Sequence, residues 1–351
     1  MIDDRRWIRD TLAHRQQEAV PYNFMFSPPA RSALQRHFGA ADLEEALAFP
    51  IRMSSPDTVK PLYADPCRYG DTLRDEYGVV WTASPIDRGA PVGPCLSKPD
   101  LRGYRFPSPA AEYRFAGLGD WCRRNRDHFT ILWVGDLWER ATFMRGMEEI
   151  LLDVALRPRF VRRLLEGIAG YILETMRILF ARFQFDGIAV SDDYGTQGGL
   201  IMAPEVWAKL VKPLLAEIYG LARRHNRVVL HHSCGDLLPV IPELIGIGLD
   251  ILHPIQPEAM DVRPGPDLLR WSGDPKAASS RRAGGNTPGG PPPQAGTGPR
   301  GRLHPGAGHH GTGGCSAAEH VGNDRGGAGG LKPQALTAPP ARPATRRFSM
   351  M

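Results

Sequence analysis

The chain has 351 residues and a formal net charge of +5, from 43 lysines and arginines against 38 aspartates and glutamates. This length fits one large α/β barrel or two smaller domains. No apolar run is long enough to span a bilayer, and the first residues precede no signal-type apolar segment, so we expect a cytoplasmic protein without a membrane partner. The five cysteines are odd in number and scattered, which argues against a disulfide framework.

The composition changes near Trp271. From there on Gly, Pro, Ala and Arg dominate, neither helical nor strand periodicity is present, and ten basic residues face three acidic ones. Such a segment cannot bury enough apolar surface to offset the entropy of ordering it. We therefore predict a folded domain over residues 1–272 and a disordered tail over residues 273–351. The tail lacks interleaved aromatics and dense basic runs, so we expect no nucleic-acid partner.

The amino-terminal half contains few clear elements. In chain order the patterns predict an amphipathic helix over 5–17, a first strand over 20–26, helices over 30–38 and 42–49, a hairpin or irregular strand over 71–81 and a loop or lid over 85–109. The clearest strand covers residues 129–134 and is followed by a helix. Asp136 and Arg140 lie between the two and are candidate substrate-binding residues, with ion pairing at a helix start as the alternative for Arg140.

The region 185–261 repeats one pattern three times: a short apolar run, a polar cluster and then, after the first two, a segment with helical spacing. The runs cover residues 185–191, 227–231 and 249–252, and the helical segments cover 203–224 and 237–245. Short bounded apolar runs are typical of strands buried on both faces of a parallel sheet. Because parallel α/β folds bind ligands at the carboxyl ends of their strands, the polar clusters predict the site.

Two of these clusters contain candidate catalytic or metal-binding residues. Asp193 and Tyr194 follow the first run, where an aspartate also commonly caps a helix. His232 and Cys234 follow the second run and are two residues apart, so both side chains point to the same side and can bind one metal ion, such as zinc. A buried thiol hydrogen-bonded to an imidazole is the alternative. His231 points the other way and is interpreted as structural.

A series of motifs occurs over residues 135–261: Gly135-Asp-Leu-Trp-Glu-Arg140, Ser191-Asp-Asp-Tyr-Gly195, Met202-Ala-Pro-Glu-Val-Trp207, His232-Ser-Cys-Gly235 and Gly248-Leu-Asp-Ile-Leu252. This series resembles the uroporphyrinogen decarboxylase superfamily, which includes the decarboxylase of haem synthesis and cobamide-dependent methyltransferases. The resemblance covers about residues 4–270. It implies a (β/α)8 TIM barrel with its site in the carboxyl-end mouth.

The methyltransferase branch resembles the chain better than the decarboxylases do. Decarboxylases have an early arginine motif for the substrate carboxylates, and residues 20–26 contain no arginine. Methyltransferases hold zinc with a His-x-Cys pair and a later cysteine. The resemblance thus implies a methyltransferase that receives its methyl group from a partner corrinoid protein, with zinc bound by His232 and Cys234. The third ligand is either elsewhere or missing.

In this hypothesis Asp193 and Tyr194 are catalytic, and Asp136, Arg140 and Gln256 bind substrate. The first alternative is a uroporphyrinogen decarboxylase, in which Asp193 would bind the pyrrole nitrogens of a tetrapyrrole substrate. The second is a non-catalytic barrel that binds a tetrapyrrole or corrinoid.

The tail is interpreted as a shifted reading frame. Residues 302–307, read one nucleotide later under permitted codons, give Gly-Tyr-Ile-Leu-Ala, and residues 285–290 become compatible with a Gly-Thr-Pro-x-Glu-Val string. Both resemble late segments of the superfamily. We therefore expect a barrel that lacks its last strands, and a chain that is inactive as written.

Overall fold

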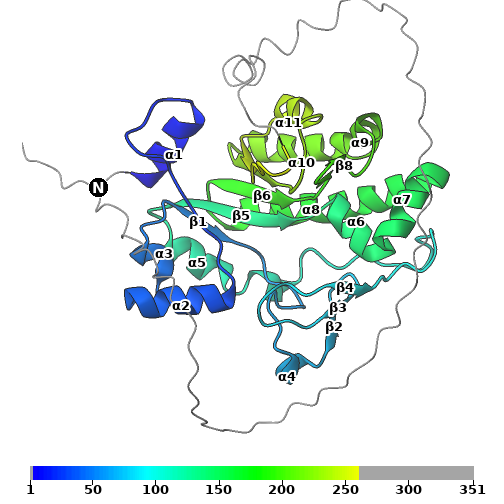
Figure 1. Cartoon of the computed structure of the whole chain (residues 1–351), viewed down its shortest axis with the longest axis horizontal. Helices are drawn as coiled ribbons and strands as arrows, with labels where there is room; N and C mark the ends of the chain where they lie inside the picture. Colours follow the sequence, from blue (N-terminus) through cyan, green and yellow to red (C-terminus); the bar gives the residue numbers. More distant parts are fainter. Residues whose placement is uncertain (1–2, 261–351) are drawn as a thin grey trace, which may run out of the picture. The chain divides into compact units, whose positions relative to one another are not determined.

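The computed structural model describes residues 3–260. A sheet of five parallel strands lies at its centre, in the order β1-β5-β6-β9-β10. Figure 1 labels β1, β5 and β6 of this sheet. The strands span Ile51–Ser54 (β1), Phe129–Gly135 (β5), Gly187–Ser191 (β6), Val228–His232 (β9) and Ile251–His253 (β10). The apolar runs predict four of them, and the predicted parallel α/β class is confirmed.

Helices connect the consecutive strands from β5 onward. They are Trp138–Arg145 (α6), Met147–Leu156 (α7) and Pro158–Arg182 (α8) before β6, Pro204–Leu210 (α9) and Lys212–Arg224 (α10) before β9, and Ile241–Ile247 (α11) before β10. Neighbours in the sheet are thus also successive in the chain, which is the connectivity of a (β/α) barrel wall. None of the described helices is long and apolar enough to cross a membrane.

Successive strand residues point to opposite faces of the sheet, and different elements cover the two faces. One face, here the helix-covered face, packs against α6 to α11 through residues such as Leu132, Ile188 and Val229. The second face has a smaller core of Phe129, Ile131, Ala189 and Leu230, to which helix α1 (Asp4–Leu12) adds Ile8. The carboxyl end of this second face is where the candidate site lies.

Helix α1 is held on the second face by a charged contact as well as by Ile8. Arg5 Nε lies 3.0 and 2.9 Å from the two carboxylate oxygens of Asp186. Asp186 is buried and also accepts hydrogen bonds from the backbone and the hydroxyl of Thr130, at 3.0 and 3.1 Å. The carboxylate therefore joins α1 to strand β5 at the amino end of the sheet.

We expect Arg5→Ala to lower the free energy of unfolding by about 1–2 kcal/mol, because it removes a charge-assisted contact to a buried carboxylate. Arg6→Ala is the matched control: its side chain is 79% exposed and lies 3.6 Å from Asp10, so a change within about 0.5 kcal/mol is expected. Urea denaturation of both variants measures the difference. Equal losses in the two variants would show that Asp186 does not anchor α1.

The predicted strand over residues 20–26 is wrong. These residues form no strand, and the first strand of the sheet is β1 instead. Pro21 has no N–H to give to a sheet, and the rings of Tyr22, Phe24 and Phe26 lie 5.7 to 6.3 Å from the ring of Phe49. Apolar residues at alternate positions therefore pack on one phenylalanine, and an apolar run of this kind is not evidence of strand pairing.

A second, antiparallel sheet precedes β5. The predicted hairpin over 71–81 is confirmed as Thr72–Arg74 (β2) paired with Val80–Thr82 (β3). Pro91–Gly93 (β4) adds a third strand inside the predicted loop over 85–109. The remaining elements are Pro28–Phe38 (α2), Leu43–Ala46 (α3), Pro66–Tyr69 (α4), Glu112–Phe115 (a 3-10 helix), Leu118–Arg124 (α5), Gly195–Thr196 (β7) and Gly199–Leu200 (β8).

The parallel sheet has two edges within the described residues, β1 and β10. Residues 3–260 therefore contain a parallel sheet of five strands and no closed eight-stranded barrel. The predicted tail over 273–351 and the shifted-frame strings within it lie outside the described residues.

Candidate metal site at the carboxyl ends of β6 and β9

The register of the parallel strands brings two polar clusters together. Ser191 of β6 pairs with His232 of β9, so Asp193 and Cys234 each lie two residues beyond this pair. The backbone ladder continues past the strands, since Asp192 N donates to His232 O at 2.8 Å. Asp193 and Cys234 are thus neighbours because each follows a strand in the same register.

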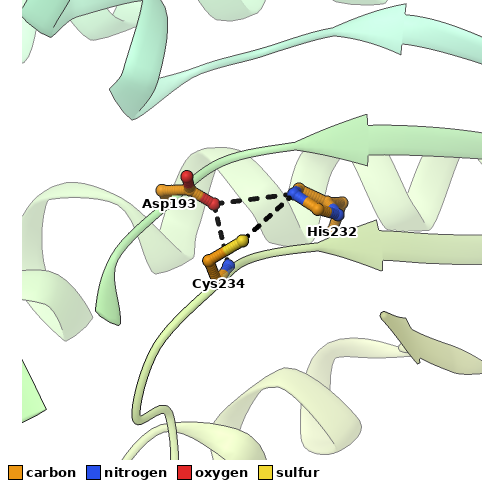
Figure 2. Close-up of side chains that lie close together, drawn as sticks. All are labelled: Asp193, His232 and Cys234. Carbon is orange, nitrogen blue, oxygen red and sulfur yellow. Dashed lines mark hydrogen bonds and ion pairs between the residues drawn. The ribbon is translucent and has the colours of Figure 1, made fainter. Parts of the chain in front are cut away.

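Asp193, His232 and Cys234 form a compact group of three possible metal ligands (Figure 2). His232 Nε2 lies 3.6 Å from Cys234 Sγ and 3.8 Å from Asp193 Oδ1. One ligand atom from each residue lies within 4.8 Å of the others, and all three residues are half-buried. The predicted pair of His232 and Cys234 is therefore joined by Asp193 as a third donor.

Backbone contacts between the two loops hold this group in place. Asp193 Oδ1 accepts a hydrogen bond from Cys234 N at 2.8 Å. Gly195 and Gly235 cross at close range, because a Cβ on Gly195 would lie 2.5 Å from Cys234 O. Gln256, which follows β10, accepts a hydrogen bond from Gly235 N at 2.8 Å through its side-chain oxygen. The predicted substrate-binding Gln256 thus supports the loop that carries Cys234.

The electrostatic environment favours a bound cation over a reactive cysteine. Burial lowers the pKa of His232, against the effect of Asp193. Burial raises the pKa of the Cys234 thiol, and the carboxylates of Asp193 and Glu139 raise it further. A thiolate–imidazolium pair, as nucleophilic cysteines use, is therefore disfavoured. A cation among these donors would be attracted by the same carboxylates and would stabilise the thiolate.

Tyr194 and His231 lie on the helix-covered side. Tyr194 is fully buried and its hydroxyl donates to the buried carboxylate of Asp192. His231 is also fully buried, its Nδ1 lies 2.7 Å from the Tyr219 hydroxyl, and burial lowers its pKa to about 3. The structural role predicted for His231 fits this position. The structure does not bring the Tyr194 hydroxyl to Asp193, His232 and Cys234.

The predicted substrate-binding pair Asp136 and Arg140 is part of a charged network. Arg140 Nη1 lies 2.8 Å from Asp75 Oδ2, and Arg140 Nη2 lies 3.2 Å from Asp136 Oδ2. Its guanidinium also stacks over Tyr77, 4.5 Å from the ring centroid. Two carboxylates thus neutralise this arginine, as expected if its role is an ion pair.

A second ion pair lies closer to the metal-ligand group. Glu139 is buried, and its carboxylate lies 2.6 Å from Arg88 and 3.3 Å from the Ser191 hydroxyl. Burial raises the pKa of Glu139, and so does the nearby Asp136. Arg88 comes from the segment predicted as a loop or lid, and no pattern in the sequence connects it to this site.

His253, and the position of Asp193 as a third donor, are not predicted from the sequence. His253 pairs with His232 in the β9–β10 register, and the Nδ1 atoms of the two rings are 2.9 Å apart. A signal for both was available in the polar residues after three successive parallel strands. Only the register of β6, β9 and β10 shows that these residues lie together, and the sequence does not show that register.

No protein-family model matches the chain, and no curated protein matches it. Among solved structures, a methyltransferase from Methanosarcina mazei is similar, with a TM-score of 0.50 and 14% sequence identity. The match covers 72% of this chain and 76% of that protein. At this identity the similarity establishes a shared fold, so the chain is an α/β protein with the fold of that methyltransferase.

Proposed function

We propose that Asp193, His232 and Cys234 bind a zinc ion. The observation that supports this most is the spacing of the donors. Zinc bonds of about 2.0–2.3 Å in tetrahedral geometry place ligand atoms about 3.3–3.8 Å apart. His232 Nε2 lies 3.6 Å from the Cys234 sulfur and 3.8 Å from the Asp193 oxygen. Sulfur, nitrogen and oxygen donors together suit zinc better than magnesium or calcium, which prefer oxygen alone.

Three protein ligands leave the fourth zinc position open, as in catalytic sites. When bound there, zinc would lower the pKa of a substrate thiol and supply it as a thiolate. The negative charges of Asp193 and Glu139 favour a cation at this position. The Cys234 backbone N–H donates to the Asp193 carboxylate and orients it. These features support a site for thiol activation.

We further propose that the chain belongs to the uroporphyrinogen decarboxylase superfamily and transfers a methyl group from a partner corrinoid protein to a thiol. The fold shared with a methyltransferase supports this, as does the resemblance of the His232-x-Cys234 motif. Asp193 is then a metal ligand in place of the later cysteine that the methyltransferases use.

Decarboxylation of a tetrapyrrole is less well supported. A substrate with many carboxylates needs several free cations. Arg140 and Arg88, at this end of the described sheet, are each paired with an acidic residue, Asp75 and Glu139 respectively. The pairing of these two arginines argues equally against a non-catalytic barrel that binds a tetrapyrrole.

The test is a zinc titration of the full 351-residue chain and its variants. We expect one zinc per wild-type chain and none in His232→Ala or Cys234→Ala, because the two remaining ligands hold the ion too weakly. Cys67→Ala is the control, since Cys67 is an exposed thiol outside the group. Equal zinc content in all four proteins would refute the site.

Activity is then measured with methylcobalamin as donor and a small thiol as acceptor. In a chain whose reading frame after residue 272 is restored, we expect zinc-dependent loss of the methyl–cobalt bond, with or without Cys67→Ala, and none with His232→Ala or Cys234→Ala. The chain as written is expected to be inactive. Consumption of uroporphyrinogen by a protein that does not methylate thiols would favour the decarboxylase.

A further inference from the structure

His253 has no role in the function proposed so far, although it touches the site. It is the last residue of β10 and pairs in register with His232 of β9. The two imidazoles lie side by side, with ring centroids 5.1 Å apart and ring planes inclined by 36°. Their Nδ1 atoms are 2.9 Å apart, which is hydrogen-bonding distance.

The position of this hydrogen bond determines the tautomer of His232. Two neutral imidazoles bond through their Nδ1 atoms only if one carries the proton and the other presents a lone pair. The opposite nitrogen of His232, Nε2, is the one that faces Cys234 and Asp193. A nitrogen that binds a metal must present its lone pair. The proton of His232 therefore belongs on Nδ1, and His253 Nδ1 is the acceptor.

We propose that His253 is a positioning residue that fixes the tautomer and the ring orientation of His232 for metal binding. The proposal rests on the zinc site proposed above. Metal-bound histidines usually donate their second N–H to a fixed partner, and loss of that partner weakens metal affinity. Other contacts position the two residues: the Trp133 ring lies 6.3 Å from the ring of His232, and Ser233 N donates to the backbone carbonyl of His253 at 2.9 Å.

This contact also makes metal affinity depend on strand pairing. β10 is an edge strand among the described residues and reaches the sheet only through β9. If β10 separates from β9, His232 loses its hydrogen-bond acceptor although its own strand stays paired with β6. Metal affinity therefore reports on whether β10 is in place.

The test compares His253→Ala and His253→Asn in the full chain. Alanine removes the acceptor, whereas the asparagine side-chain oxygen occupies nearly the position of Nδ1 and can accept the same hydrogen bond. Ile255→Ala is the control, because Ile255 is exposed and close to His253 in the chain. Zinc affinity is measured by competition with a chromophoric chelator, and the visible absorption of the cobalt(II) form reports ligand geometry.

We expect His253→Ala to weaken zinc binding about 10- to 100-fold and to change the cobalt(II) spectrum, even at saturating cobalt. His253→Asn should restore most of the affinity and the wild-type spectrum, and Ile255→Ala should leave both unchanged. A wild type that binds one zinc together with a His253→Ala variant of equal affinity and spectrum would overturn the proposal. A wild type that binds no zinc would instead refute the site itself.

Discussion

Replacing Gly235 with alanine is expected to abolish metal binding and to lower the free energy of unfolding by about 2–5 kcal/mol. Gly235 has a φ of +82°, a region that L-residues with a side chain disfavour. An added Cβ would also lie 2.3 Å from the carbonyl carbon of Gly195. The two loops would have to separate. Since Asp193 precedes Gly195 and Cys234 precedes Gly235, this movement would pull two of the three metal ligands apart.

Gly198→Ala is the matched control, because Gly198 lies in the same loop as Gly195 and a Cβ there would meet nothing within 4 Å. It should retain zinc and nearly all of the stability. Gly195→Ala should resemble Gly235→Ala in zinc loss, since its Cβ would lie 2.5 Å from Cys234 O. Zinc titration and urea denaturation measure the two effects. Full zinc binding by Gly235→Ala would mean that the close crossing of the loops is not needed for the site.

Two of the strands that the sequence predicts correctly, β5 and β6, share one property: most of their apolar residues are buried on both faces of the sheet. Residues 129–134 and 185–191 satisfy this requirement, and β5 and β6 form there. Residues 20–26 are also apolar, but Pro21 has no N–H for a sheet, and the segment contacts the Phe49 ring while Val20, Phe24 and Met25 stay exposed. Local composition therefore specifies neither strand pairing nor burial by itself.

The same limit applies to the site: contacts within one segment are predicted from the sequence, and contacts between segments are not. The two-residue spacing of His232 and Cys234 is local, so the sequence predicts that they lie together. Asp193 lies 39 residues before His232 in the chain and joins them only through the register of β6 with β9. His253 joins through the register of β9 with β10. Contacts between loops depend on strand register, and no pattern within one segment determines it.

Removing the carboxylate of Asp192, the neighbour of Asp193, is expected to lower the free energy of unfolding. It is fully buried, and its Oδ1 accepts hydrogen bonds from Leu137 N at 3.0 Å and from Glu139 N at 2.8 Å. Its Oδ2 accepts from the Tyr194 hydroxyl. Asp192→Ala would leave these three buried donors without their acceptor and is expected to cost about 3–5 kcal/mol, because each unsatisfied donor costs about 1–3 kcal/mol. Urea denaturation in the presence of a chelator measures this without a contribution from metal.

Two asparagine variants separate stability from metal binding at adjacent positions. Burial raises the pKa of Asp192 above its usual range. The amide of Asp192→Asn has the shape of the native side chain, so it still accepts both N–H groups through Oδ1 and meets the Tyr194 hydroxyl with its NH2 group. We expect this variant to lose only about 1 kcal/mol. Asp193→Asn should hardly change the stability, since Asp193 is half-buried, but it should weaken zinc binding because an amide oxygen is a poorer ligand than a carboxylate. If Asp192→Asn lost zinc while Asp193→Asn kept it, the metal-binding carboxylate would be the buried one, and the assignment of Asp193 would be wrong.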